Sequence, residues 1–206
     1  FKVERKSLDE IFVPSLAVGI SSMERRRLTR ELVFDLSNHL SVQPRQWVMF
    51  ADDSGVCLRN IDHLLPPDVQ VPYAPPYAEF YWAPAGSDGS YRLASPGLWA
   101  VRGEHLPLVL ERWKEAWSGE KGEEGSTEEE TWTRVVRELP LRKRAFEKGE
   151  VVAPRIGAVD WEAVSNAAFV TVPDWPEKEA WKFLQALYFG TYLGDETGLM
   201  LNILEA

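Results

Sequence analysis

Two stretches near the start of the chain carry the pattern that decides the fold: Pro14–Ser22 (PSLAVGISS) and Trp47–Gly55 (WVMFADDSG). The first is short, apolar and interrupted by small residues, which predicts a buried strand over Phe12–Ile20. Between the two stretches, leucines recur at every fourth position, which is the spacing of one helix face. A helix is therefore predicted from about Met23 to Leu40, with arginines on its opposite, solvated face.

A second strand is predicted over Trp47–Ala51, and two acidic residues, Asp52 and Asp53, follow it directly. A strand, a crossover helix and a strand in this order form a parallel, right-handed unit. Ligands of open α/β sheets collect at the carboxyl ends of the strands, so an acidic strand end suits a nucleotide site. The two aspartates also suit a strand-end turn that caps a following helix, and both interpretations stay open.

The whole chain of 206 residues, 45% of them hydrophobic, is predicted to form a single α/β domain over residues 1–206. Its fold class is predicted to be three-layer, with a mainly parallel sheet and flanking helices. A Gly-, Glu- and Ser-rich stretch at about 118–130 is predicted to be a flexible acidic loop. Ser126 or Thr127, each three residues before a glutamate, is predicted to cap the helix that follows this loop.

Several further elements are predicted from hydrophobic spacing and from proline and glycine punctuation. They are a short helix over Leu58–Leu65, an edge strand over Glu79–Ala83, strands at Leu98–Val101, Glu150–Ala153 and Ala168–Val172, and helices at Leu106–Trp117, Trp132–Leu139 and Pro176–Tyr192.

Composition excludes several function classes. The net charge of −9 argues against a general nucleic-acid or anionic-membrane binder, and no apolar run reaches the roughly 20 residues of a membrane helix. The single cysteine, Cys57, together with an opening that lacks an apolar leader core, predicts a reducing compartment, the cytoplasm. Cys57 itself has the apolar context of a small packed residue. No phosphate-binding glycine loop, zinc ligand set or serine-nucleophile motif is found.

The two opening stretches, with the leucine-striped segment between them, resemble the start of a GT-A fold nucleotide-sugar glycosyltransferase of the family-2-like type. That pattern begins with a Pro-Ser-apolar strand, continues with a helix, and ends a second strand in two aspartates. The resemblance implies transfer of a sugar from a nucleotide-diphosphate donor to an acceptor hydroxyl. It implies that Ser21, Ser22, Asp52 and Asp53 surround the base and ribose, with Arg25 near the phosphates.

The same resemblance implies a metal ion and a general base. The chain lacks the clean Asp-x-Asp motif with which the family binds its metal ion. On the resemblance, Asp88, in Gly86–Gly89, takes the place of that motif as the ligand for Mn²⁺ or Mg²⁺. Asp195 or Glu196 resembles the late acidic pair that deprotonates the acceptor. This pair also suits the N-terminus of a helix, where the macrodipole favours acidic residues.

Three alternatives stay open from the sequence. The missing Asp-x-Asp motif fits a non-catalytic binding protein on a degenerate transferase scaffold. The clusters Arg25–Arg27 with Arg30, and Arg142–Arg144, suit either a phosphate-handling site or solvated helix faces. The aromatic, proline-rich run Pro72–Trp82 suits either a sugar-stacking wall or a packed loop.

Overall fold

The computed structural model describes residues 30–31, 33–34, 42–51, 55–59, 65, 78–85, 92–119, 127–147, 149–172 and 175–192. The chain divides into two compact units, Phe1–Ser41 and Val42–Ala206. In the first unit, the described residues Arg30, Glu31, Val33 and Phe34 are helical, in agreement with the helix predicted there. Arg30 is buried, however, and does not lie on a solvated face.

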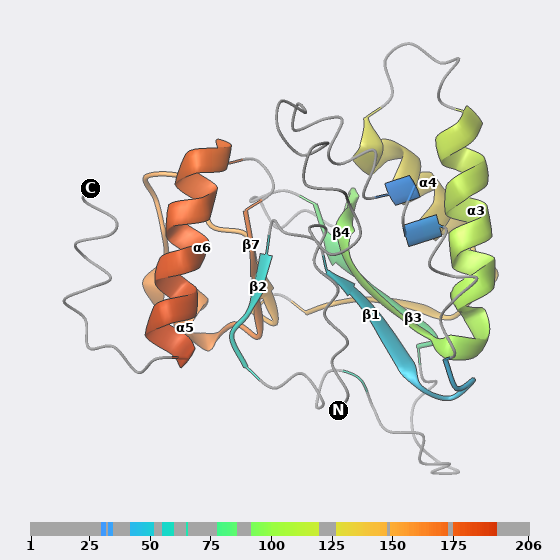
Figure 1. Cartoon of the computed structure of the whole chain (residues 1–206), viewed down its shortest axis with the longest axis horizontal. Coiled ribbons are helices and arrows are strands. Elements are labelled where there is room, and N and C mark those ends of the chain that lie inside the picture. The colour runs from blue at the N-terminus through green and yellow to red at the C-terminus, as the bar shows by residue number, and fades with distance from the viewer. Residues whose placement is uncertain are drawn as a thin grey trace, which may run out of the picture. The chain divides into compact units, whose positions relative to one another are not determined.

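The larger sheet of the second unit has four strands in the order β1-β4-β3-β5 (Figure 1). The strands are β1 (Trp47–Ala51), β3 (Phe80–Pro84), β4 (Ala94–Arg102) and β5 (Lys143–Ala145). The central strand β4 is antiparallel to both of its neighbours, whereas β3 and β5 are parallel. Consequently β1, β3 and β5 all run in the same direction.

Two helices, α3 (Leu106–Gly119) and α4 (Glu128–Glu138), contribute to the core on one face of this sheet. A short 3₁₀ helix, η2 (Gly103–His105), joins β4 to α3. The predicted cap of α4 is confirmed: the Thr127 hydroxyl accepts a hydrogen bond from Glu130 N at 3.2 Å, and Glu130 Oε2 accepts one from Thr127 N at 2.9 Å. This reciprocal pair satisfies two backbone donors that the helix leaves free.

The core between sheet and helices is built from large aromatic rings, which we call the tryptophan core: Phe50, Phe80, Trp99, Trp113 and Trp132. Trp99 of β4 stacks on Phe50 of β1 at 5.4 Å and lies 5.5 Å from Trp132 of α4. Trp113 of α3 is 4.5 Å from Trp132. The three indoles are at most 1% exposed. Alternate residues of a strand point to opposite faces, which is why Phe50, Phe80 and Trp99 face this core whereas the adjacent Tyr81 and Ala100 belong to a separate cluster.

The other face of the larger sheet packs against the smaller sheet. Tyr81 of β3 stacks on Phe146 at 5.6 Å, and both share a buried cluster with Ala100 of β4 and Phe169. Cys57 packs at the margin of this cluster, and burial raises the pKa of its thiol, so the thiol stays protonated near neutral pH. This agrees with its prediction as a packed residue.

The smaller sheet has the order β2-β7-β6, with β2 (Gly55–Cys57) antiparallel to β7 (Phe169–Thr171) and β6 (Val151–Val152) parallel to it. Helices α5 (Trp161–Asn166) and α6 (Glu177–Tyr192) lie beside it (Figure 1). Val164, Val170 and Phe183 form the centre of the core between them. The backbone carbonyl of Glu150 accepts hydrogen bonds from the N–H groups of Ala168 and Phe169 at 3.0 and 2.9 Å, at the start of β7.

The predicted α/β class with flanking helices is confirmed, but the sheets are mixed rather than mainly parallel in the described part of the chain. There, three of the five strand pairings are antiparallel. The physical reason is the β3–β4 hairpin, whose short connection brings the chain straight back and forces antiparallel pairing. Within the described ranges, none of the helices combines the length and the apolar character needed to cross a bilayer.

Two local predictions were wrong. The strand predicted at the sheet edge over Glu79–Ala83 lies inside the sheet, as β3, between β4 and β5. Pairing on both sides is possible because Pro84 stands at the end of β3, where the register shifts. The helix predicted over Leu58–Leu65 is absent at the three positions described, Leu58, Arg59 and Leu65. The strands β2 and β5 and the helix α5 were not predicted.

Candidate functional site

One edge of the larger sheet gathers the carboxyl ends of three strands. Because β1, β3 and β5 run in the same direction, Ala51, Pro84 and Ala145 end their strands at this edge. We call it the carboxyl edge. Ligands of α/β proteins collect at such an edge because loops leaving the strand ends can enclose them. Asp52 and Asp53 follow β1 directly in the sequence, and Asp88 follows β3 by four residues.

Specific hydrogen bonds hold the two ends of the segment that carries Asp88. Ala85 N donates to the Leu93 carbonyl at 2.8 Å, and Ala94 N donates to Thr133 Oγ1 at 2.8 Å. The buried Thr133 hydroxyl in turn donates to the Glu129 carbonyl, at 2.6 Å, within α4. The capped helix α4 therefore anchors the point at which the chain re-enters the sheet as β4.

The smaller sheet meets the same region through the start of β2. Only Asp52, Asp53 and Ser54 separate Ala51 of β1 from Gly55 of β2, so the Cα atoms of Ala51 and Gly55 are at most about 15 Å apart. Gly55 pairs with Thr171 at the carboxyl end of β7. A Cβ on Gly55 would stand 3.1 Å from the Val170 carbonyl oxygen and from Thr171 Cγ2, so the strands approach closely here.

The side chains of the predicted site residues lie outside the described residues. This holds for the nucleotide-site residues Ser21, Ser22, Arg25, Asp52 and Asp53, for the metal ligand Asp88, and for the acidic pair Asp195 and Glu196. In the described part of the chain, no three His, Cys, Asp or Glu side chains cluster as metal ligands. The structure places the strand ends from which Asp52, Asp53 and Asp88 follow at the same end of the larger sheet, with Ala51 opposite Leu98 and Pro84 opposite Ala94 of β4. The roles of the three aspartates stay predictions.

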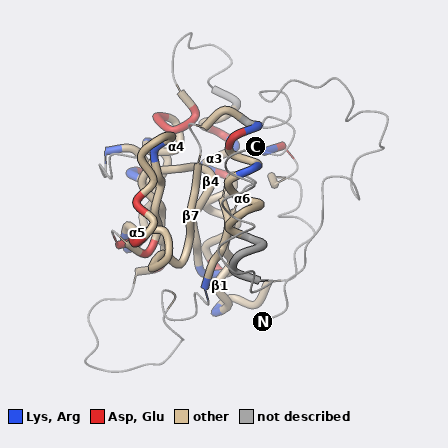
Figure 2. Tube along the Cα trace, turned by 90° about the vertical axis from the view of Figure 1, so that its left-hand side faces the viewer, with Lys and Arg blue, Asp and Glu red and all other residues tan. Residues whose placement is uncertain are grey.

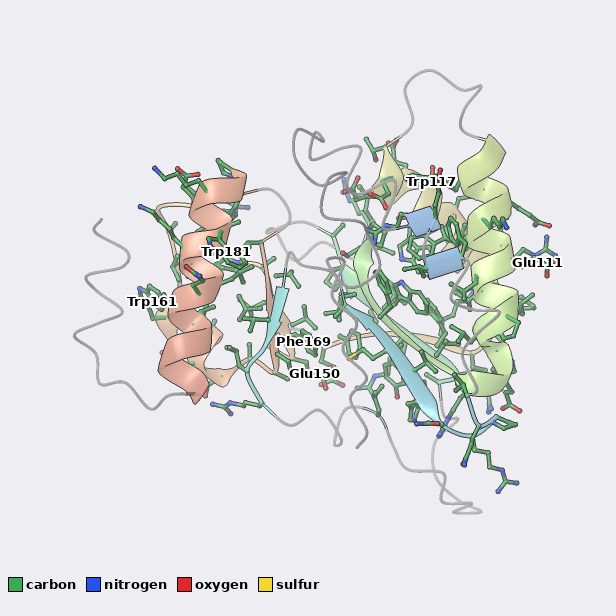
Figure 3. All side chains as sticks on the ribbon, in the orientation of Figure 1. Glu111, Trp117, Glu150, Trp161, Phe169 and Trp181 are labelled. Carbon is green, nitrogen blue, oxygen red and sulfur yellow. The ribbon has the colours of Figure 1, made fainter. Side chains whose placement is uncertain are left out.

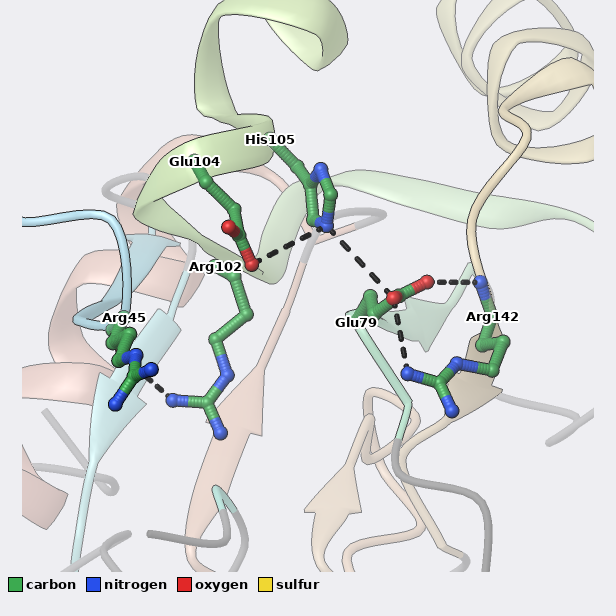
Figure 4. A network of polar contacts seen from close by, with 6 residues as sticks. All are labelled: Arg45, Glu79, Arg102, Glu104, His105 and Arg142. Atoms are coloured by element: carbon green, nitrogen blue, oxygen red, sulfur yellow. Dashed lines mark hydrogen bonds and ion pairs between the residues drawn. The ribbon is translucent and has the colours of Figure 1, made fainter. Parts of the chain in front are cut away.

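The opposite edge of the larger sheet holds a polar cluster around Glu79, which sequence reasoning missed (Figure 4). The Glu79 carboxylate accepts hydrogen bonds from Arg142 N and from Arg142 Nη2, both at 3.0 Å. His105 Nε2 lies 3.9 Å from Glu79 Oε1 and 3.7 Å from Glu104 Oε1. Nothing local in the sequence could have indicated this cluster, because 63 residues separate Glu79 from Arg142.

The cluster joins chain segments rather than presenting a reactive group. Hydrogen bonding from the Arg142 backbone N–H, aided by its guanidinium, holds the pKa of Glu79 below its usual range. Glu79 N donates to the Arg142 carbonyl at 2.7 Å, and Arg102 N donates to the Glu79 carbonyl at 3.2 Å. Glu79 therefore fastens the start of β3 to the start of β5 and the end of β4.

The basic cluster Arg142–Arg144 is engaged in the same structural way. Lys143 Nζ donates to the Arg137 and Leu139 carbonyls, at 2.8 and 2.9 Å, where α4 ends. Arg144 forms an ion pair with Glu147. Each cation has a partner within the fold, which favours a structural role over phosphate handling. In the aromatic run Pro72–Trp82, residues 72–77 lie outside the described residues, and the buried Phe80 and Tyr81 belong to strand β3 and to packed cores rather than to a loop.

Comparison with known proteins adds one informative likeness. No protein-family model matches the chain, and no curated protein matches it in sequence. Among solved structures it is similar to a glycosyltransferase involved in the glycosylation of the major capsid of PBCV-1, with a TM-score of 0.55 and 14% sequence identity. The likeness covers 82% of this chain and 79% of that one. The chain has a glycosyltransferase-like fold. At this identity the likeness establishes the fold and leaves the chemistry to be argued from the site.

Proposed function

We propose that the protein transfers a sugar from a nucleotide-diphosphate donor to an acceptor hydroxyl. The observation that carries this proposal is the shared carboxyl edge, from which Asp52–Asp53 and the Asp88 segment both depart. The similarity of the fold to a glycosyltransferase supports it independently. A reducing compartment, the cytoplasm, is part of the same proposal.

In the proposed site, Asp52 and Asp53 accept hydrogen bonds from the ribose hydroxyls or a base N–H, and Ser21 and Ser22 are proposed to bind the same nucleoside. Arg25 binds the diphosphate through its planar guanidinium. The acceptor oxygen attacks the anomeric carbon, the bond from that carbon to the phosphate oxygen breaks, and Asp195 or Glu196 takes the acceptor proton.

A divalent ion fits the same chemistry. Carboxylate oxygen is a preferred ligand of Mg²⁺ and Mn²⁺, and the ion commonly completes its coordination with substrate phosphates. Asp88 is the residue proposed to hold it. When bound, the ion would neutralise charge on the departing diphosphate.

Nucleotide binding tests the proposal directly. Titration calorimetry with uridine diphosphate and guanosine diphosphate, with and without Mn²⁺, should give heat for at least one nucleotide. Asp52→Ala and Asp53→Ala should each abolish that heat, whereas Glu111→Ala, at an exposed position of α3, should leave it unchanged. Absence of both heat and thermal shift under all of these conditions would overturn the proposal.

A second measurement separates an enzyme from a binding protein on the same scaffold. Slow hydrolysis of a nucleotide-sugar donor should be detectable and should disappear in Asp52→Ala. Nucleotide binding with no donor breakdown and no transfer to any acceptor would instead favour the non-catalytic alternative.

A further inference from the structure

A second set of aromatic rings comes from three places in the chain: the first residue of α5, the segment after β7, and α6. Trp175 and Trp161 both rest against Phe183 of α6, with ring centroids 4.8 and 5.9 Å from it. Phe183 is 1% exposed, whereas Trp161 is 44% exposed and Trp175 is half-buried. We call Trp161 and Trp175, backed by Phe183, the aromatic platform.

The platform is held in place. Trp175 Nε1 donates to the Pro154 carbonyl at 2.8 Å, two residues beyond the end of β6, and Trp175 N donates to the Val172 carbonyl at 3.2 Å, just beyond β7. Trp161 is the first residue of α5, where the Asp160 carboxylate caps the helix by accepting from Ala163 N at 3.0 Å. A preorganised indole loses little conformational entropy when a ligand stacks on it.

The platform is continuous with the proposed transfer site through the strand pairing. Trp175 follows Val172, which follows Thr171, and Thr171 pairs with Gly55. Val56 and Trp175 pack against the same core. Gly55 comes two residues after Asp53 in the sequence. The start of β2, which follows Asp52–Ser54 in the sequence, therefore pairs with the end of β7, four residues before Trp175. This connection supports an acceptor subsite near the proposed donor subsite.

Charge around the platform selects the kind of ligand. In the sequence, Trp161 stands between two exposed acidic residues: Asp160, the N-cap of α5, and Glu162, the acidic residue of α5, in whose region Figure 2 shows red. Carboxylates repel a phosphate or a nucleotide, but they accept hydrogen bonds from sugar hydroxyls. An apolar ring bordered by acceptors matches the pyranose ring, which has C–H groups on its faces and hydroxyls at its edge.

We propose that the aromatic platform is the acceptor subsite, and that it binds a neutral saccharide by stacking on Trp161 and Trp175. This inference rests on the proposed function, which supplies the need for a hydroxyl-bearing acceptor.

The test uses the full chain labelled with 5-fluorotryptophan, so that each of the nine tryptophans reports separately by ¹⁹F NMR. The signals of Trp161, Trp175 and Trp181 are assigned by their loss in single variants. The probes are methyl glycosides of glucose, galactose and mannose, with lactose and maltose as longer acceptors. At least one probe should shift the Trp161 and Trp175 signals saturably, and Trp161→Ala should weaken that affinity about tenfold, read from Trp175.

Trp181, labelled in Figure 3, provides the matched control, because it is 62% exposed on α6 and stands two residues from Phe183, a spacing that turns the two side chains to opposite sides of a helix. Its signal should stay unchanged, and Trp181→Ala should bind the saccharide as the parent does. Shifts of equal size at Trp181, or no shift at Trp161 and Trp175 with any probe, would overturn the proposal.

The experiment separates the two proposals. If uridine or guanosine diphosphate binds but no saccharide shifts the tryptophan signals, the acceptor-subsite proposal is refuted and the transferase proposal stands. If a saccharide shifts the signals but no nucleotide binds, the platform is a carbohydrate site and the transferase proposal is refuted.

Discussion

The two aromatic clusters of this protein use the same residue type in opposite ways. In the tryptophan core, Trp99, Trp113 and Trp132 are at most 1% exposed and contact one another. In the aromatic platform, Trp161 keeps 44% of its surface in solvent. The exposed fractions differ because the tryptophan core lies between the larger sheet and two helices. In the platform, Trp161 begins α5 and Trp175 follows β7.

This comparison teaches that tryptophan content alone says little about function. An indole enclosed on all sides contributes chiefly to stability, because apolar area removed from water is its main effect. An indole backed on one face only has a second face free for a ligand. Substitutions in the buried cluster and then in the exposed one test whether the first acts in stability and the second in ligand binding.

Removing an indole from the tryptophan core should have the largest effect. Trp132→Ala is expected to lower the free energy of unfolding by about 3–5 kcal/mol, because it leaves a large cavity beside Trp99 and Trp113. Urea denaturation followed by circular dichroism measures the loss, with Trp132→Phe as a milder variant that folds more readily. Trp181→Ala, the exposed control, should change stability by less than about 0.5 kcal/mol. Equal losses of unfolding free energy in Trp132→Ala and Trp181→Ala would refute the distinction between buried, stabilising indoles and exposed ones.

The Glu79 cluster should matter next, because it holds the start of β3, which carries Phe80 into the tryptophan core. Glu79→Gln is expected to cost about 1–2 kcal/mol at pH 7. The folded-state pKa of Glu79 is lowered, so its contribution is complete above the unfolded pKa and is lost as the pH falls through the folded pKa. Unfolding free energies of parent and variant should therefore converge in acid. A difference that persists unchanged at pH 2 would contradict the charge-based account, and Glu111→Gln is the control.

The cap of α4 should have a smaller effect. Thr127→Ala removes the hydroxyl that accepts from Glu130 N, at the start of the helix that carries Trp132. We expect a loss of about 1 kcal/mol in unfolding free energy, which Thr127→Ser should largely restore. No loss in the alanine variant would mean that the tertiary contacts of α4 hold its N-terminus without the cap.

The platform should be the least sensitive region in stability. Trp161→Ala is expected to cost about 1 kcal/mol or less, since it removes one partly exposed contact with Phe183. The saccharide affinity should fall about tenfold in the same variant. A large stability loss in thermal unfolding would assign Trp161 to the core instead and would weaken the functional distinction between the two clusters.

Local pattern predicted most of the regular elements well. The strand Trp47–Ala51 matches β1, and the predicted helix Pro176–Tyr192 differs from α6 by one residue. The capping pair Thr127–Glu130 was also predicted, because a cap depends on residues three apart. The pattern failed at β5, which is mostly charged (KRA), and at β2, which begins with a glycine after an acidic stretch. The comparably short β6 and β7 were predicted because they lie in apolar, β-branched runs.

The candidate sites show the same contrast between features of local sequence and features assembled from distant residues. The acidic pair Asp52–Asp53 was predicted as a site because it directly follows a strong apolar strand, and its role stays a prediction. The platform was missed because its parts come from separate elements, with Trp161 on α5, Trp175 beyond β7 and Phe183 on α6. No spacing rule links such residues.

By itself, the sequence determined where most of the described strands and helices form, the capping of α4, and the α/β class. These follow from side-chain periods of two and 3.6 residues and from contacts between near neighbours. Only the tertiary structure decided that β4 lies at the centre of a mixed sheet, that Glu79 meets Arg142, and that Trp161 and Trp175 share one backing ring. These outcomes depend on which strands pair and in which direction, and that choice is made by burial and hydrogen bonding summed over the whole fold.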